Sequence, residues 1–186
     1  YSLLSTSTDE EVARDFILFG QPTVTVVVTD ATRLERNLNL ALQVLEITDR
    51  VVIALNLMDE AKRHGLKVDE RRLSRDLGVP VVPMAARQGV GIPDLIGAIS
   101  QVAEGQFQTK PHHVQYRDPK VEAAVTRLVD QIEADFPELP NARWVALRLL
   151  DGDPSIVKAV REGTLGSLTR NTSPEQTNVV QLQAVG

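Results

Sequence analysis

The chain contains no cysteine and few aromatic residues, which make up 4% of its 186 residues. Without cysteine there is no disulfide framework and no thiolate metal site. The sequence also lacks any apolar run close to the ~20 residues that a membrane-spanning helix requires. Its start has no basic segment followed by a long apolar one, so we expect no signal peptide in these residues.

An excess of positive charge is absent as well. Lys and Arg number 20 against 25 Asp and Glu, the net charge is −5, and the pI is near 5.2. This balance argues against a nucleic-acid partner or an anionic membrane surface. With 42% hydrophobic residues, the composition is that of a globular chain with one domain and a smaller appendage. The chain begins at Tyr1 without an initiator Met, and we expect it to be a piece of a longer protein.

The most informative stretch that is present runs from Val51 to Asp59. Its first five residues are apolar and predict a strand that is buried on both faces of a parallel sheet. Asn56 and Asp59 follow in the pattern Asn-x-x-Asp. Open α/β sheets bind their ligands at the carboxyl ends of such strands, so this polar pair marks a candidate site.

An aspartate in this position has the chemistry to read guanine. Its carboxylate can accept hydrogen bonds from N1–H and from the exocyclic amino group, whereas adenine has an acceptor at N1 and no 2-amino group. An unmatched charged group costs on the order of 1–3 kcal/mol, which is enough to select the base. Asn56 would donate near guanine N7 and tie neighbouring loops together. The other interpretation is that Asn56 and Asp59 are turn residues that cap a helix.

Strands and helices are expected to alternate around this stretch. Thr23–Thr29 predicts a β-branched strand before it, and Val79–Met84 predicts a third strand whose prolines favour a sheet edge. Helical patterns lie between them, which predicts crossovers and a parallel sheet over residues 1–105. Residues 106–186 are helical in pattern, beginning at the cap Asp118-Pro119. The first of these helices carries an apolar stripe of Val121, Ala124, Val125, Leu128 and Ile132.

The loop after the third strand favours a nucleotide site. In guanine-nucleotide-binding folds a Ser-Ala-Lys loop stands at this separation, and its backbone N–H meets guanine O6. Here the tripeptide is Ala85-Ala86-Arg87, so the backbone donors remain but the serine hydroxyl that usually braces the aspartate is missing. The lysine of the usual Asn-Lys-x-Asp is replaced by Leu57, which keeps aliphatic stacking over the base. Taken alone, the loop Ala85–Gly91 is better interpreted as an ordinary Gly-containing strand-to-helix connection.

Three segments in order, Asp30–Leu38, Ala54–Ala61 and Val81–Ile92, resemble the GTPase domain of the ferrous iron transport protein B family. Arg143–Asp153 resembles that family's helical spacer domain. The resemblance implies an α/β fold: a P-loop GTPase-like parallel sheet whose P-loop half is absent, followed by a small all-α helical domain. It implies GTP or GDP as the ligand, with contacts from Asn56, Leu57, Met58, Asp59, Ala85, Ala86 and Arg87.

The resemblance also implies partners outside these residues. It implies an N-terminal half of the G domain, a C-terminal membrane domain that conducts ferrous iron, and a place on the cytoplasmic side of the bacterial inner membrane. The resemblance is also compatible with a homo-oligomer.

The chain departs from the family pattern at the phosphate side of the site. It has no Gly-x-x-x-x-Gly-Lys-[Ser/Thr] and no Asp-x-x-Gly motif of the kind that holds Mg²⁺. Phosphoryl transfer depends on cations and donors placed around the γ-phosphate. We therefore expect Mg²⁺ only in the complete domain, no catalytic residue in this chain, and no GTP hydrolysis by the chain alone.

Two functions of different class remain open. One is a GTPase module, incomplete in these residues, that couples guanine-nucleotide state to iron passage through a membrane partner. The other is a non-catalytic interaction module in which base binding is vestigial. His112 and His113 are adjacent in a polar linker and cannot easily converge on one ion, so we expect no metal site there.

Overall fold

The computed structural model describes residues 8–107, 109–110, 118–137, 139, 141–163 and 165. These residues form two compact units, one built mainly from residues 22–110 and the other mainly from residues 118–165. The N-terminal helix α1 (Thr8–Gly20) is divided between the two. Each unit is described by itself below.

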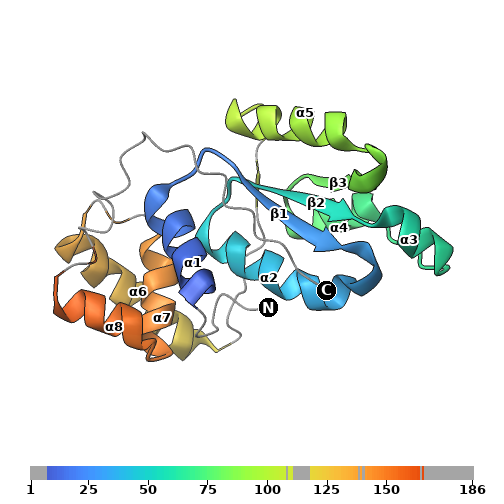
Figure 1. Cartoon of the computed structure of the whole chain (residues 1–186). Helices are drawn as coiled ribbons and strands as arrows, with labels where there is room; N and C mark the ends of the chain where they lie inside the picture. The colour runs from blue at the N-terminus through green and yellow to red at the C-terminus, as the bar shows by residue number, and fades with distance from the viewer. Residues whose placement is uncertain are drawn as a thin grey trace. The chain divides into compact units, whose positions relative to one another are not determined.

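The first unit is built on a parallel sheet of three strands in the order β1-β2-β3 (Figure 1). The strands are β1 (Thr25–Asp30), β2 (Val51–Asn56) and β3 (Val81–Pro83). Register pairs Asp30 with Asn56 across β1 and β2, and Leu55 with Pro83 across β2 and β3. Because parallel strands share one carboxyl edge, the residues that follow all three strands gather at that edge. The predicted partial parallel sheet is confirmed, with the proline-containing strand at its edge.

Two long helices cover the opposite faces of the sheet, α2 (Leu34–Ile47) on one side and α5 (Ile92–Ala103) on the other (Figure 1). On the α5 side, Val52 and Ala54 of β2 pack with Val82 and Val102, and with the half-buried Leu95 and Ile99. Residues 51–55 are all buried, as expected for a central strand covered on both faces.

The coverage of β1 is less complete than that of β2. Its residues alternate between buried and half-buried, with Val26 and Val28 only partly covered on the α5 side. In the part of the chain that the structure describes, β1 pairs with β2 along one edge and with no strand along the other. Among the described residues, the sheet therefore has an unpaired edge next to an apolar face that is only partly covered.

Short helices connect the strands at the two ends of the sheet. They are η1 (Ala31–Arg33), α3 (Met58–Arg63), α4 (Glu70–Leu77) and η2 (Ala86–Gln88). Asp69 caps α4 by accepting a hydrogen bond from the Arg72 amide at 2.9 Å, and Gly78 ends it in the left-handed conformation at φ 73°. An aspartate N-cap and a glycine in the left-handed conformation at the carboxyl end are common helix boundaries.

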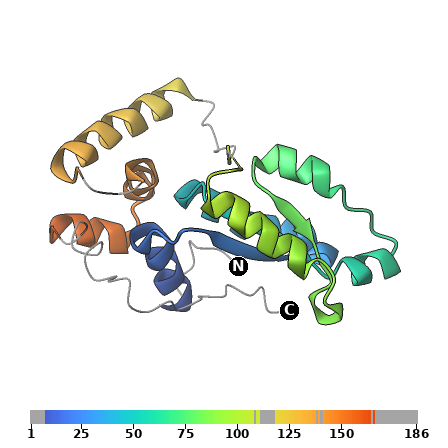
Figure 2. The same cartoon turned by 90° about the horizontal axis from the view of Figure 1, so that it is seen from above.

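The second unit is helical and contains α6 (Pro119–Asp135), α7 (Ala142–Leu150) and α8 (Pro154–Arg161), coloured from gold to red in Figure 2. Asp118 caps α6 by accepting from the Lys120 amide at 2.8 Å. Helix α7 packs against both α6 and α8. Within residues 118–165, the buried apolar residues are Val125, Ile132, Ala142, Trp144, Val145, Ala146, Leu147, Ile156 and Leu165. Among the described residues, no helix has the length and apolar character to cross a membrane.

Candidate functional site

The two stretches that the sequence singles out lie together at the carboxyl edge of the sheet. Asn56 is the last residue of β2, and Asp59 lies in the first turn of α3. Ala85, Ala86 and Arg87 follow β3. The backbone joins the two stretches, because the Met84 amide donates to Leu55 O at 2.8 Å and Met84 O accepts from the Met58 amide at 3.0 Å.

Asn56 makes a direct bond between the two loops. Its Oδ1 accepts a hydrogen bond from the Ala86 amide at 3.0 Å. This bond uses the amide oxygen of Asn56 and leaves the two N–H donors of its Nδ2 for other acceptors. It also engages the Ala86 N–H, whereas the Arg87 amide has no hydrogen-bond partner among the described residues.

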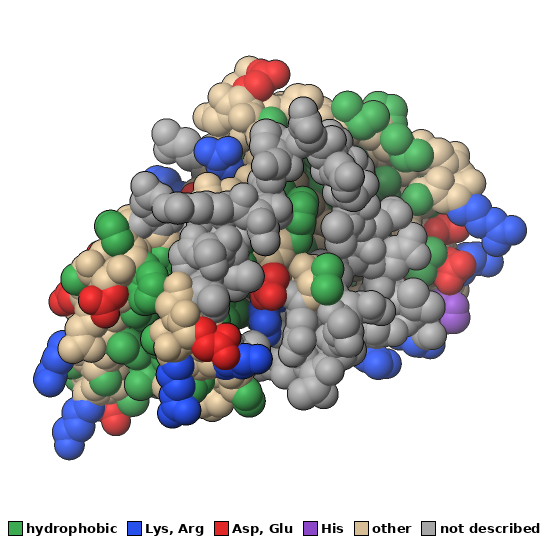
Figure 3. All heavy atoms as spheres, turned by 60° about the vertical axis from the view of Figure 1, so that its left-hand side comes forward, with side chains coloured by type: hydrophobic (Ala, Val, Ile, Leu, Met, Phe, Trp, Pro, Cys, Tyr) green, Lys and Arg blue, Asp and Glu red, His purple; other side chains and the backbone are tan. Residues whose placement is uncertain are grey.

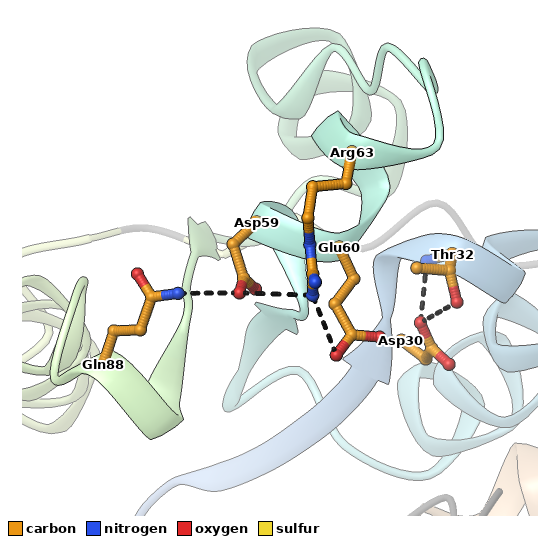
Figure 4. A network of polar contacts seen from close by, with 6 residues as sticks. All are labelled: Asp30, Thr32, Asp59, Glu60, Arg63 and Gln88. Carbon is orange, nitrogen blue, oxygen red and sulfur yellow. Dashed lines mark hydrogen bonds and ion pairs between the residues drawn. The ribbon is translucent and has the colours of Figure 1, made fainter.

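Asp59 has its carboxylate at the surface of the site, where its side chain is 31% exposed. Gln88 Nε2 donates to Asp59 Oδ2 at 2.8 Å, and Arg63 Nη2 lies 4.0 Å from the same oxygen (Figure 4). Arg63 is closer to Glu60, at 3.4 Å. Gln88 is not among the residues that the sequence motifs select, because only the length of its side chain and the turn of its loop bring it to Asp59.

Leu57 has an unusual backbone conformation, with φ 60° and ψ 31° in the left-handed region. For a non-glycine residue this conformation costs roughly 1–2 kcal/mol. It reverses the chain between β2 and α3, so Asn56 and Asp59 are both presented at the edge of the sheet. Leu57 and Met58 are half-buried. Backbone strain at a ligand-binding edge is a recurrent feature of functional sites.

The loop after β3 is closed on itself. Ala85 and Val90 exchange both backbone hydrogen bonds, at 3.1 Å and 3.3 Å, and the Gln88 amide donates to Ala85 O at 2.9 Å. Gly91 has φ 82°, and a Cβ there would stand 2.4 Å from Pro83 O. The close approach of backbone at Gly91 therefore fixes where the loop leaves the sheet.

Asp30 ends β1 at the same edge but already has local partners. Its Oδ1 accepts from both the amide and the hydroxyl of Thr32, each at 2.7 Å (Figure 4). The bonds hold the turn into η1, so Asp30 is a structural residue in this conformation. The tetrapeptide Asp94-Leu95-Ile96-Gly97 has the Asp-x-x-Gly spacing, but it lies inside α5 and not at a strand end.

A hollow of about 500 Å³ lies elsewhere in this unit, beside Asp49 and Arg50, which precede β2, and the end of α5. It borders the amino end of β2, whereas the candidate site is at the carboxyl end.

No cluster of three or more His, Asp or Glu suited to a metal occurs among the residues that the structure describes. His112 and His113 lie outside these residues. On the face drawn in Figure 3, Lys and Arg side chains lie among Asp and Glu side chains.

Comparison with known families covers both units. A family described as ferrous iron transport protein B matches residues 1–99, and the FeoB cytosolic helical domain matches residues 118–181. The chain belongs to the ferrous iron transport protein B family. The FeoB Fe(2+) transporter of Escherichia coli K12 is 36% identical over 148 residues, which are 80% of this chain and 18% of that protein. The Fe(2+) transport protein A/Fe(2+) transporter FeoB fusion protein of Porphyromonas gingivalis is 36% identical over 89% of this chain and 20% of its own length.

Solved FeoB structures share the fold. The cytosolic domain of T. maritima FeoB in its GMPPNP form has a TM-score of 0.76 at 32% identity, over 87% of this chain and 63% of that one. The FeoB G domain of Methanococcus jannaschii is 45% identical over 56% of this chain and 67% of that one, with a TM-score of 0.55. The present chain spans about one fifth of the length of the curated FeoB relatives it matches.

Proposed function

We propose that this chain supplies the base-recognising half of a guanine-nucleotide-binding domain, over residues 1–105, and a helical spacer domain, over residues 106–186. The observation that carries the proposal is the meeting of Asn56, Asp59 and the Ala85–Arg87 loop at one edge of the sheet. The FeoB cytosolic domain of T. maritima, which shares this fold, has been solved in GDP and GMPPNP forms.

Each residue has a distinct role in this proposal. The carboxylate of Asp59 accepts from N1–H and the 2-amino group of guanine. Asn56 Nδ2 donates toward N7 while its Oδ1 holds the Ala86 amide. The Arg87 amide, and Ala86 beside it, face guanine O6, and the aliphatic side chain of Leu57 packs on the flat face of the base, with Met58 behind it. Matched pairs of this kind select a base because the wrong base leaves a charged group unpaired.

The phosphate side of the site belongs, in our proposal, to a separate N-terminal half of the G domain. That half would cover the open edge and the half-buried face of β1. Mg²⁺ at nucleotide sites is usually held by one or two protein ligands together with the phosphates and water, so in this proposal it binds only in the complete domain. We propose that GTP hydrolysis by the complete domain is coupled to ferrous iron uptake through a C-terminal membrane region, with this chain on the cytoplasmic side of the bacterial inner membrane.

The test of base recognition is Asp59→Asn in the parent polypeptide that includes the phosphate-binding half. The amide replaces one acceptor by a donor, so GDP affinity should fall by at least about tenfold, since hydrogen bonds to a charged group contribute ~1.5–3 kcal/mol each. Xanthine nucleotides, whose 2-oxo group needs a donor, should bind better than in the wild type. Isothermal titration with GDP and XDP measures both effects.

The matched control is Asp76→Asn. Asp76 is an exposed residue of α4, its carboxylate lies 3.5 Å from Arg72 Nε, and it is not at the carboxyl edge of the sheet. The variant should leave both affinities unchanged. GDP binding that is equally strong in wild type and Asp59→Asn would contradict the role of Asp59, and a parent polypeptide that binds no GDP would favour the non-catalytic interaction module.

A further inference from the structure

The hydrogen bond from Gln88 to Asp59 joins the two halves of the candidate site through side chains. Its length is 2.8 Å, and it connects residues that are 29 positions apart in sequence (Figure 4). The other tie in the site, from the Ala86 amide to Asn56, runs between the same two loops. Each polar residue of the Asn-x-x-Asp pattern is thus held by the loop that follows β3.

A carboxylate that reads a base has to be held in one plane. The last torsion of an aspartate side chain is broad, so an unrestrained carboxylate samples many orientations. Asp59 is partly exposed, and neither a capping bond nor burial fixes it. Arg63 is a weak restraint, because it is 70% exposed, 4.0 Å away and closer to Glu60. The short bond from Gln88 is the contact that orients Asp59.

Gln88 can hold Asp59 without blocking it. A carboxylate oxygen has two lone pairs, so Oδ2 can accept from Gln88 Nε2 and from a base donor together, while Oδ1 accepts the second base donor. Gln88 is itself held in place, because its amide donates to Ala85 O and the loop is closed by the Ala85–Val90 bonds. The orienting group therefore stands on a fixed support.

We propose that Gln88 is a positioning residue for guanine recognition, which holds the Asp59 carboxylate in the plane that accepts the two donors of the base. This inference rests on the proposed function of Asp59. It assigns to Gln88 the bracing role that no side-chain hydroxyl at Ala85 can take. The opposite role, in which Gln88 competes with the base for Asp59, is an outcome that the test distinguishes.

The test uses Gln88→Ala and Gln88→Met in the parent polypeptide, the second of which keeps the length of the side chain and removes the donor. GDP should dissociate about fivefold faster from both variants, the effect of one hydrogen bond at a partly exposed site. IDP lacks the 2-amino group, so its affinity should fall less and the preference for GDP over IDP should narrow. Stopped-flow release and titration of the two nucleotides measure these effects.

Gln106→Ala is the matched control. It removes the same kind of bond, from Gln106 Nε2 to Glu104 Oε2 at 2.6 Å, at the end of α5 and not at the site. It should change neither rate nor preference. Unchanged or tighter GDP binding in both Gln88 variants overturns the positioning role, and tighter binding shows competition. If Asp59→Asn binds GDP as the wild type does, or if the parent binds no GDP, the proposed function fails and the role of Gln88 fails with it.

Discussion

At the scale of single residues, the loop after β3 contains two glycines with different constraints. Gly89 and Gly91 both have positive φ, at 74° and 82°. A Cβ on Gly89 would meet no atom within 4 Å, whereas one on Gly91 would stand 2.4 Å from Pro83 O and 3.2 Å from the Met84 Cα. The backbone at Gly91 is therefore held against β3 by a contact that only glycine permits.

Gly91→Ala should destabilise the first unit more than Gly89→Ala does. The second variant costs roughly 1–2 kcal/mol for a side chain in the left-handed region, and the first adds a backbone clash that the loop has to move to relieve. Denaturant unfolding of the two variants measures the difference. Equal unfolding free energies would show that the loop leaves the sheet without the close approach at Gly91.

The residues of this site were predictable from the sequence to different degrees. Asn56 and Asp59 stand at the end of a strongly apolar strand, so their place at the sheet edge follows from the pattern alone. The left-handed conformation of Leu57 and the reach of Gln88 do not, because they depend on how two loops far apart in sequence close on each other. No local pattern in one sequence encodes such a contact.

At the scale of elements, an ion pair joins two helices of the second unit. Arg143 of α7 donates from Nη1 and Nη2 to the two carboxylate oxygens of Glu122 in α6, at 2.7 Å and 3.2 Å. The hydrogen bond with Arg143 is the largest influence and lowers the pKa of Glu122 below 4.5. Desolvation opposes it with a smaller effect, and the charge of the guanidinium adds the smallest contribution, which also lowers the pKa. The two-point geometry fixes the rotation of α6 relative to α7.

The pH dependence of this pair has a definite sign. The pKa of Glu122 is lower in the folded chain, so the stability from the pair is complete above pH 4.5 and is lost as pH falls through the lowered value. Glu122→Gln should lower stability near neutral pH and flatten the loss of stability below pH 4.5. Thermal unfolding across that range measures both, with Glu162→Gln, in the longer 3.9 Å pair with Lys158, as control. Parallel curves for wild type and Glu122→Gln would contradict this account.

The boundaries of helices were more predictable from the sequence than the faces that they bury. The cap at Asp118 and the end of α4 at Gly78 lie where local chemistry places them. The apolar stripe expected on α6 is only partly buried: Val125 and Ile132 are covered, whereas Val121 and Ala124 are exposed. Which face of a helix is buried depends on the elements that pack against it. Helix α6 packs against α7, and the spacing of the apolar residues in α6 does not predict which of them this contact covers. Ser173-Pro174-Glu175-Gln176 has the spacing of a capping box, which predicts another helix, but these residues lie outside the described ones.

At the scale of the molecule, the first unit has a buried apolar core and, among the described residues, an unpaired strand edge at β1. In the described part of the chain, β1 is six residues long, is paired on one side only, and carries Val26 and Val28 half-exposed. An unpaired strand edge with apolar residues beside it is a template for pairing with another chain. Only β3, at the other edge, is short and contains proline.

Residues 1–186 made alone should therefore self-associate through β1 as concentration rises. Val26→Lys places a charge on the half-covered face and should reduce association, whereas Val121→Lys, on an exposed position of α6, should leave it unchanged. Light scattering over a concentration series follows the change. A single monomeric species with one cooperative melting transition would contradict the expectation.

The two main-chain hydrogen bonds of Met84 limit how the two segments of the proposed base-binding site can be exchanged with those of relatives. They tie the Asn56–Asp59 turn to the Ala85–Gln88 loop, so a shift in one segment carries the other with it. If the loop after β3 were taken from a relative without that relative's Asn-x-x-Asp turn, the Asp59 carboxylate would be displaced relative to the new loop. We expect these two segments to behave as a single cassette that can be exchanged together but not one at a time.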